Sequence, residues 1–409
     1  MPPTLPTELI LSILGFLTHE RSVARCCRLS RAFLPLMRQR LYRDITFGET
    51  ETSYPDFASG AGAEFGDWRH SPPLHVLNER STRLYHSLCH NYYLSSLPRR
   101  VIIDTYQSAD TERAALLDHL LEQCPYAESV ALRSLGRGFC WAEGDHQQVM
   151  ETIRRLLPRL KELRIEEWTS RSSEGKLEAF GRLEHLKSLR IDAMDAEHFK
   201  DNAPLQFHLQ HLHIGDAIPP ATLSFLTASS LPSLRDLTLT IDEYAYDLTS
   251  YSSLSSLSLR IALVDWDAQD EHEDLARNLS STLATCPPSV TSIAIMDVGQ
   301  TARLDVLDRT RVLDHLPPSL SRLDLGKTSL GTEYLLELFA KPSFLPSLSH
   351  IILGGWIETD FRSDHYLGVQ RREEEERRAV ERVFAERAKG GREVRVQWME
   401  KPWSAADET

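Results

Sequence analysis

The stretch Leu231-Pro232-Ser233-Leu234-Arg235-Asp236-Leu237-Thr238-Leu239 carries the pattern on which this chain of 409 residues is built. It reads Leu-Pro-x-Leu-x-x-Leu-x-Leu, and its last three residues alternate between apolar and polar. Because successive side chains of a β-strand point to opposite faces, Leu237 and Leu239 are predicted to point into a core. Thr238 then faces outward, so the stretch predicts a short strand with a Leu-Pro lead-in.

The same pattern recurs from about residue 97 onward. Three other good copies begin at Leu157, Leu316 and Leu345. Weaker copies end at Ile103, Leu132, Ile191, Ile214, Leu259 and Ile295. The paired apolar positions begin at residues 101, 130, 163, 189, 212, 237, 257, 293, 323 and 351. These ten positions span 250 residues in nine intervals, a mean of about 28 residues, near the upper end of the ~20–29 residues of a leucine-rich repeat.

Helical stretches separate the predicted strands. They cover residues 111–123, 148–157, 274–285 and 332–340. No repeat can bury its own apolar face, so neighbouring repeats must stack. The pattern resembles the leucine-rich repeat family, in its irregular form without the usual Asn, whose place falls near Gly215, Thr240 and Gly326. The resemblance implies an α/β fold in which parallel strands form one face of a solenoid and helices and loops form the other. An ordinary α/β sheet is the alternative, which the repeated Leu-Pro lead-in disfavours.

The end of the repeat array needs a cap, because the last repeat would otherwise expose its core. Residues 371–389 predict an amphipathic helix that Gly390-Gly391 ends, and residues 393–398 predict a final alternating strand. The charged run 371–378 is interpreted as a solvated helix face with spaced ion pairs rather than as a binding tail.

The first 45 residues predict three short helices, because their apolar residues recur at spacings of three and four. These residues are Leu9, Ile10, Ile13, Leu14, Phe16 and Leu17 in the first helix, Val23, Cys26, Cys27 and Ser30 in the second, and Phe33, Leu36, Met37 and Leu41 in the third. Pro6 suits the first position of a helix, where its missing N–H costs nothing. A segment this small rarely folds alone without a disulfide, a metal or a partner, so a partner is expected.

This segment resembles the F-box family. The match runs through Leu5-Pro6-x-Glu8-Leu9-Ile10-x-x-Ile13-Leu14-x-x-Leu17, then Cys26/Cys27, then Leu29-Ser30-Arg31-x-Phe33, and then Leu41-Tyr42-Arg43-Asp44-Ile45. The sequence departs from the family at Phe33, where a Trp is usual, and at Thr18-His19-Glu20, where Asp-Pro is frequent. The resemblance implies binding to a Skp-family adaptor and, through it, to a cullin ubiquitin ligase. The alternative is a three-helix cap that covers the open end of the downstream domain.

The resemblance also implies which residues contact the adaptor. They are Leu5, Pro6, Leu9, Ile10, Ile13, Leu14, Leu17, Val23, Leu29 and Phe33. Residues 1–45 are therefore expected to form an F-box-like helical module. Residues 46–80 form a linker or irregular insert rich in Gly, Ser and acidic residues. Residues 81–398 form the solenoid with its C-terminal cap, and residues 399–409 form a tail.

Charge and cysteine content narrow the class of protein. The net charge is −13, which argues against a nucleic-acid or membrane partner. Residues 1–50 carry seven Arg against four acidic residues, so this basic head is expected to meet an acidic partner or to be a solvated helix face. The six cysteines form no C-x-x-C, and neither a signal peptide nor an apolar run of ~18 residues is visible. A cytoplasmic or nuclear location is expected.

No motif for catalysis stands out. The sequence contains no nucleophile elbow, P-loop or His-Glu-x-x-His pattern, so an enzyme, a cofactor and a bound metal are not expected. Residues 265–276 resemble a calcium loop but have Asp270 where Gly is required and Ala276 where Glu is required. A zinc site at His208, His211 and His213 would need further ligands.

The sequence thus predicts a non-enzymatic adaptor that links a protein target to a ubiquitin ligase and does not form a homo-oligomer. The target is expected on the exposed positions of the central strands. The candidate residues are Arg164, Arg190, His211, His213, Thr238 and Arg260. The main rival is a repeat-protein scaffold without a ligase partner, and an enzyme with a site in an insertion loop is a third alternative.

Overall fold

A computed structural model describes most of the repeat region of the chain. The described residues are 25, 34–48, 77–105, 110–134, 145–168, 183–194, 205–261, 269–297, 311–327, 332–341, 343–354, 366–389 and 393–398. The ten residues predicted to contact the adaptor, from Leu5 to Phe33, lie outside them, as does the tail 399–409. The chain divides into two compact units. Unit 1 holds residues 1–189 and 198–207, and unit 2 holds residues 190–197 and 208–409.

The strands in the described residues are parallel wherever their pairing is resolved, and their order in the sheet follows the sequence. Unit 1 contains β1 (Asp44–Gly48), β2 (Arg100–Thr105), β3 (Ser129–Ser134) and β4 (Glu162–Trp168). β5 (Ser188–Met194) begins in unit 1 and ends in unit 2. Unit 2 contains β6 (His211–Ile214), β7 (Asp236–Ile241), β8 (Ser256–Ile261), β9 (Ser292–Asp297), β10 (Arg322–Lys327), β11 (His350–Leu353) and β12 (Arg395–Trp398).

The paired apolar residues fall in strands β2 to β11, as predicted. In unit 2, Leu237 lies opposite Leu257, which lies opposite Ile293 on the next strand. Leu323 and Ile351 continue the same row, and all five side chains are at most 1% exposed. The alternation of apolar and polar residues therefore fixes the register at the start of these strands, because a shift by one residue would expose the whole row. The register of β9 and β10 shifts only further along, between Asp324 and Lys327.

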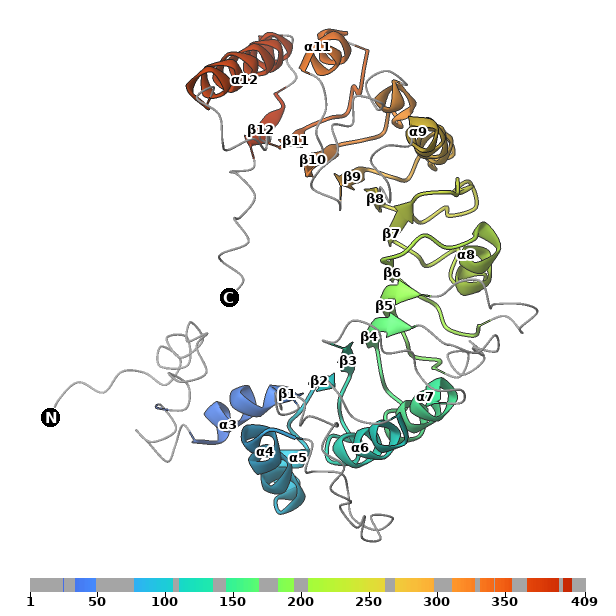
Figure 1. Cartoon of the computed structure of the whole chain (residues 1–409), viewed down its shortest axis with the longest axis vertical. Coiled ribbons are helices and arrows are strands. Elements are labelled where there is room, and N and C mark those ends of the chain that lie inside the picture. Colours follow the sequence, from blue (N-terminus) through green and yellow to red (C-terminus); the bar gives the residue numbers. More distant parts are fainter. Residues whose placement is uncertain are drawn as a thin grey trace, which may run out of the picture. The chain divides into compact units, whose positions relative to one another are not determined.

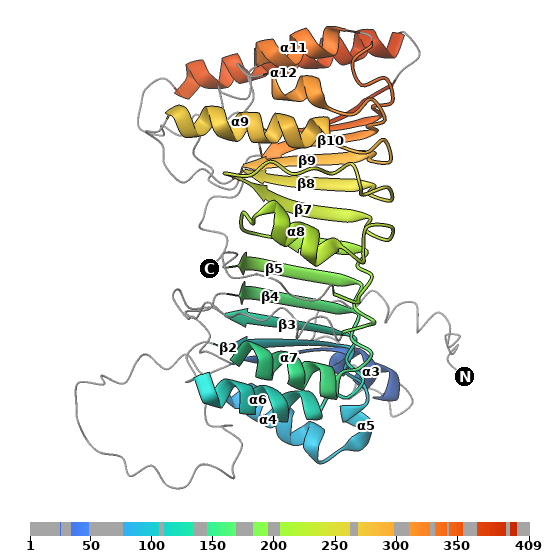
Figure 2. The ribbon, with the colours of Figure 1, turned by 90° about the vertical axis from the view of Figure 1, so that its right-hand side faces the viewer.

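Helices cover one face of the strands in each unit, as Figures 1 and 2 show. In unit 1 they are α3 (Leu34–Arg43), α4 (Glu79–Cys89), α5 (Tyr92–Ser95), α6 (Asp110–Glu122) and α7 (Asp145–Leu156). In unit 2 they are α8 (Pro220–Thr227), α9 (Gln269–Ala284), the 3-10 turn η4 (Val312–His315), α11 (Thr332–Ala340) and α12 (Tyr366–Lys389). The four helices predicted between strands are confirmed as α6, α7, α9 and α11. None of the described helices is long and apolar enough to cross a lipid bilayer.

A recurring turn joins each helix or loop to its strand. The residue before the strand donates its N–H to the matching residue of the preceding repeat, as Arg235 N does to Gln210 O at 2.9 Å. The first strand residue donates to the same oxygen, at 3.0 Å for Asp236 N. Ser255 and Ser256 repeat this pattern onto Arg235 O, each at 2.9 Å. The carbonyl groups at the turn are thus satisfied by the next repeat, and stacking completes the backbone hydrogen bonding.

Some repeats carry no helix and bury a loop instead. Between β7 and β8 the loop buries Tyr246, Leu248, Tyr251 and Leu254, each at most 3% exposed. The Tyr246 hydroxyl lies 2.9 Å from Ile218 O, to which it donates, and 3.3 Å from Ile218 N, from which it accepts. Burial raises the pKa of Tyr246 to about 12, so the phenol stays protonated. A buried aromatic side chain with a satisfied hydroxyl therefore fills the space that a helix fills elsewhere.

The first strand of unit 1 crosses the predicted boundary between the F-box-like module, residues 1–45, and the linker, residues 46–80. Asp44 to Gly48 form β1, which pairs in parallel with β2 and buries Ile45 and Phe47. The preceding helix α3 buries Met37 completely. The end of the F-box-like segment is thus continuous with the sheet of unit 1, because its alternating residues satisfy the same pattern as the repeats.

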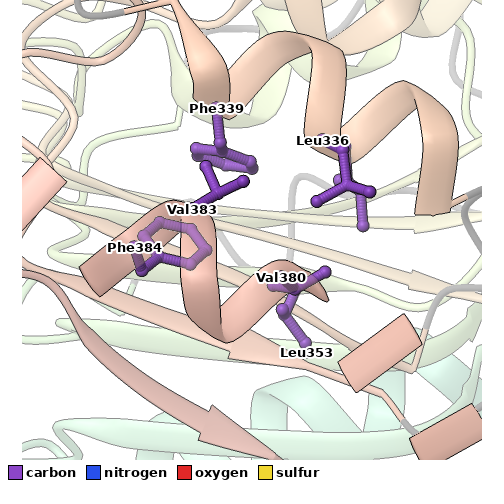
Figure 3. Close-up of a pocket in the computed structure, with 7 residues that line it drawn as sticks. Leu336, Phe339, Leu353, Val380, Val383 and Phe384 are labelled. Carbon is purple, nitrogen blue, oxygen red and sulfur yellow. The ribbon is translucent and has the colours of Figure 1, made fainter. Parts of the chain in front are cut away.

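The predicted C-terminal cap is present as α12 and β12. Figure 3 shows Val380, Val383 and Phe384 of α12 facing Leu336 and Phe339 of α11. The rings of Phe339 and Phe384 lie 4.9 Å apart between centroids, and the space between the two helices is too small for a water molecule. Glu375 and Arg378 of α12 are exposed, as expected for a solvated helix face. Arg377 is also exposed, but it pairs with Glu381 at 3.3 Å and its Cζ lies 5.1 Å from the centre of the Trp398 ring of β12.

Candidate functional site

The candidate site is the face of the strands that the helices do not cover. We call this face the outer face. Alternation along each strand places polar side chains there and apolar side chains toward the helices. All six residues predicted to contact a target lie on this face and are exposed or partly exposed. Arg164 belongs to unit 1, and Arg190, His211, His213, Thr238 and Arg260 belong to unit 2.

In unit 1, charged residues of three neighbouring strands form a chain of ion pairs. Arg133 on β3 lies between two carboxylates, with its Nε 4.0 Å from Asp104 Oδ1 and 3.6 Å from Glu166 Oε1. Arg164 Nη2 lies 3.5 Å from the same Glu166 oxygen. The four side chains are between 16% and 32% exposed, so they are shielded from water more than ordinary surface pairs. They form a mixed-charge surface whose net formal charge is zero.

Asp104 is the most shielded of these four groups. Its Oδ1 is buried and accepts no hydrogen bond from the described residues. Desolvation therefore raises the pKa of Asp104, and the charge of Arg133 only partly opposes the rise. A raised pKa in the folded state means that the native protein holds this proton more tightly than the unfolded chain does. The contribution of Asp104 to stability therefore falls as the pH rises from the ordinary pKa of an Asp carboxyl to its raised pKa in the folded protein.

We expect the substitution Asp104→Asn to leave the protein at least as stable as the parent at pH 7. The amide carries no charge to desolvate, and the lost ion pair is long and partly exposed, so the gain is at most about 1 kcal/mol. Melting temperatures of both proteins at pH 4 and pH 7 measure the effect. The advantage of the variant should shrink at pH 4, where the parent carboxylate is more often protonated. A variant that melts several degrees lower at pH 7 would show that the pair with Arg133 outweighs desolvation.

In unit 2, Asp192 joins two of the predicted target-binding residues. Arg190 Nε donates to Asp192 Oδ1 at 2.7 Å, and His213 Nε2 lies 3.3 Å from the same oxygen. Arg190 and Asp192 are two residues apart on β5, so their side chains share the outer face. His213 comes from the neighbouring strand β6. His213 Nε2 is buried beside the carboxylate and forms no hydrogen bond with the described residues, so Arg190 alone of the two donates to Asp192.

Arg260 lies on the same face further along unit 2. Its Nη1 donates to Gly215 O at 3.4 Å, and Thr240 Oγ1 donates to that oxygen at 2.5 Å. Thr240 is buried at 2% exposure and occupies the place where the repeat family usually has Asn. The two donors satisfy the last carbonyl at the end of β6, and the rest of the Arg260 guanidinium adds positive charge to the outer face.

The other two predicted residues lie at separate positions. His211 Nδ1 lies 2.5 Å from Asp236 Oδ2, its register partner on β7. Thr238 lies opposite His213 on one side and Ser258 on the other. The structure therefore brings Arg190 and His213 together through Asp192. It leaves Arg164, His211 and Arg260 in contacts of their own.

The acidic residues in these contacts on the outer face were not predicted from the sequence. Asp104, Glu166 and Asp192 each lie on the outer face beside an Arg, and Asp236 lies there beside His211. The spacing of two residues in Arg164-x-Glu166 and Arg190-x-Asp192 is a signal that could have identified two of them. The pairs between strands could not be identified in this way, because they depend on the register of the sheet.

No metal-ligand group is evident on this face. Among the described residues, no three His, Cys, Asp or Glu side chains are placed to hold a metal ion. His208 lies away from the other two histidines considered for zinc, with its Nδ1 2.7 Å from Ser229 O.

Comparison with known proteins does not extend this description. No protein-family model and no curated protein matches the chain. A solved structure of a protein from Bacteroides fragilis is similar at 12% identity with a TM-score of 0.32. The match covers 57% of this chain and 67% of that protein. A functional assignment must therefore be argued from the outer face and from the N-terminal segment.

Proposed function

We propose that this chain is a substrate-recognition adaptor of a Skp–cullin–F-box ubiquitin ligase, built on a leucine-rich-repeat-like solenoid. Residues 5–45 would bind a Skp-family adaptor, and the outer face would hold a protein target. The ubiquitin transfer itself would be carried out by other subunits. The proposal is carried by the resemblance of residues 5–45 to the F-box family. The continuity of residues 34–48 with the sheet of unit 1 is compatible with it.

That continuity has a mechanical consequence. The last block of the motif, Leu41 to Ile45, ends helix α3 and begins strand β1. Met37, Ile45 and Phe47 are at most 4% exposed, so this junction is packed rather than a free tether. A ligase core bound at residues 5–33 would therefore be joined to the repeats through this packed junction. Proximity of this kind is what a ligase requires, because catalysis depends on placing the target near the transferred group.

A scaffold without a ligase partner is the second candidate. The same burial of Met37 and Phe47 favours it, because a helical cap would also cover the first strand of an open sheet. The two candidates differ in one property only, the affinity of the N-terminal segment for a Skp-family adaptor.

We expect the full chain to co-purify with a Skp-family adaptor in a 1:1 complex. The double substitution Leu5→Ala, Pro6→Ala should weaken this complex at least about tenfold, since a few anchor residues carry most of the energy of an interface. Pro2→Ala, Pro3→Ala is the matched control and should bind like the parent. Deleting residues 1–33 should abolish binding, and this cut leaves α3 and β1 intact, whereas a cut after residue 45 would remove part of β1.

The result also distinguishes the two candidates. If the full chain and the deletion variant are both folded by circular dichroism and neither binds the adaptor, the ligase proposal is wrong and the scaffold remains. Arg190→Ala and Arg260→Ala lie on the outer face of unit 2 and should not change adaptor binding. A loss of adaptor binding in these variants would contradict the assignment of the outer face to the target.

A further inference from the structure

Three large aromatic side chains among the described residues are exposed, although most of the others are buried. They are Tyr92, Tyr93 and Tyr126, with exposures of 76%, 45% and 42%. All three belong to unit 1, at the edge where β2 and β3 begin. Tyr92 and Tyr93 open the short helix α5, and Tyr126 lies in the turn before β3. Exposed aromatic residues grouped at one edge are typical of a binding surface.

Contacts within the group hold it in one arrangement. The hydroxyls of Tyr92 and Tyr126 lie 3.4 Å apart, and Arg99 Cζ lies 5.8 Å from the centre of the Tyr126 ring. Arg99 Nη1 donates to Ser96 O at 2.9 Å and to Pro98 O at 3.1 Å. The guanidinium therefore bridges the turn after α5 and the turn before β3. A surface that is already ordered loses little conformational freedom when it binds a partner.

The group also carries positive charge toward helix α3. Arg99 N donates to Arg43 O at 2.8 Å, which places Arg43, the last residue of α3, beside it. Helix α3 has no acidic residue in its sequence LPLMRQRLYR. Among the described residues, no carboxylate lies within ion-pair distance of Arg43 or Arg99. The nearby Glu128 forms its ion pair with Lys161, at 2.6 Å. That hydrogen bond is the main cause that lowers the pKa of Glu128, and the charge of Arg99 adds to it without forming an ion pair.

We propose that Arg43, Tyr92, Tyr93, Arg99 and Tyr126, the arginine–tyrosine patch, bind an acidic segment of the Skp-family adaptor. This inference rests on the proposed function and adds a second contact beyond residues 5–33. Charge complementarity points to an acidic partner, and the contact of α5 with α3 points to one already bound by the F-box-like segment. Tyr and Arg are the residue types that most often dominate interface energy. Residues 1–33 of this chain do not fit as the occupant, because they carry four Arg and two Glu.

The test measures the affinity of the full chain for a purified Skp-family adaptor by calorimetry. Arg43→Glu should weaken binding about fivefold to tenfold, more at low salt than at high salt. Tyr92→Ala with Tyr93→Ala should weaken it about tenfold, and Tyr92→Phe with Tyr93→Phe should restore most of the affinity. Arg235→Glu is the matched control, because Arg235 is also exposed and also precedes a strand. It should bind within about twofold of the parent, because Arg235 belongs to unit 2 and is not part of the patch.

The outcomes separate this inference from the proposed function. If the parent binds and deletion of residues 1–33 abolishes binding, but the patch variants bind like the parent, the patch inference alone is wrong. If the folded parent does not bind the adaptor, both are wrong. A parent chain that is dimeric by light scattering and becomes monomeric with Arg43→Glu would assign the patch to a second copy of the chain and overturn the inference. Melting curves establish whether each variant is folded. If the variant with Tyr92→Ala and Tyr93→Ala does not fold, the affinity of Arg43→Glu tests the inference alone.

Discussion

We expect the variant Gly215→Ala to melt well below the parent protein. A Cβ atom at this position would lie 1.9 Å from the backbone oxygen of Asp192 and 2.6 Å from its carbonyl carbon. Both are backbone atoms, so no side-chain rotation can relieve the overlap, and β6 must move away from its neighbour. Gly215 N donates to Ile191 O at 2.8 Å, and this bond would be stretched. Overpacking of this kind costs about 3 kcal/mol or more, roughly 6–12 °C for a unit of this size.

The outer face gives a second readout of the same substitution. Gly215 O accepts hydrogen bonds from Thr240 and Arg260, so a displaced strand would also move these donors. Gly48→Ala is the matched control, because its Cβ would meet only the side-chain amide of Asn78, at 3.0 Å. The Asn78 side chain caps α4 by accepting from Ser81 N at 2.9 Å, but a shift of a few tenths of an ångström is enough to make room, so this variant should lose less stability than Gly215→Ala. A melting temperature within 2 °C of the parent corresponds to a loss of roughly 1 kcal/mol or less. That result for Gly215→Ala would show that the strands separate easily.

The substitution Phe47→Ala should have an effect of similar size. Phe47 is fully buried in β1, and its register partner Ile103 on β2 is 2% exposed. Removing a buried phenyl ring costs about 3–5 kcal/mol, because transfer energy is lost and a cavity remains. The corresponding fall in melting temperature is roughly 6–20 °C. Thermal unfolding of the full chain, followed by circular dichroism, measures the change.

Thr46→Ala provides the control for Phe47→Ala. Thr46 is the neighbouring residue on the same strand and is exposed on the opposite face, so its truncation should change the melting temperature by less than 2 °C. If Phe47→Ala is equally mild, residues 44–48 do not belong to the folded core, and the proposed coupling of the F-box-like segment to the repeats loses its support. If the variant is unstable as expected, residues 44–48 belong to the folded core of unit 1, and the end of the F-box-like segment is packed against the repeats.

The strands of the repeats could be predicted from the sequence because their signal is local. A leucine pair such as Leu237 and Leu239 requires only alternation within three residues to define a strand and its buried face. Ten such pairs in chain order predicted the ten strands from β2 to β11 and their parallel stacking. The helices between them, such as α9 and α11, could be predicted for the same reason, since their apolar spacing lies within one segment.

Elements that depend on distant partners were not predicted. Strand β1 looks like the end of a helical module, and only pairing with β2 reveals it as part of the sheet. Helix α8 is short and mostly apolar, with a Pro start, so it has no clear amphipathic period. The loop around Tyr246 has no period at all, and the contact of its hydroxyl with Ile218, 28 residues away, gives it a defined place.

The same distinction between local signals and contacts of distant residues applies to the outer face. From the pattern of residues alone, Arg164, Arg190, His211, His213, Thr238 and Arg260 are assigned to this face, since side-chain alternation is a property of the strand itself. Their partners depend on the register and on the spacing of strands. These place Asp192 between Arg190 and His213, Asp236 beside His211, and Gly215 against Asp192. Side chains many residues apart along the chain become neighbours only when the repeats stack, so the ion pairs and the required glycine are properties of the folded sheet.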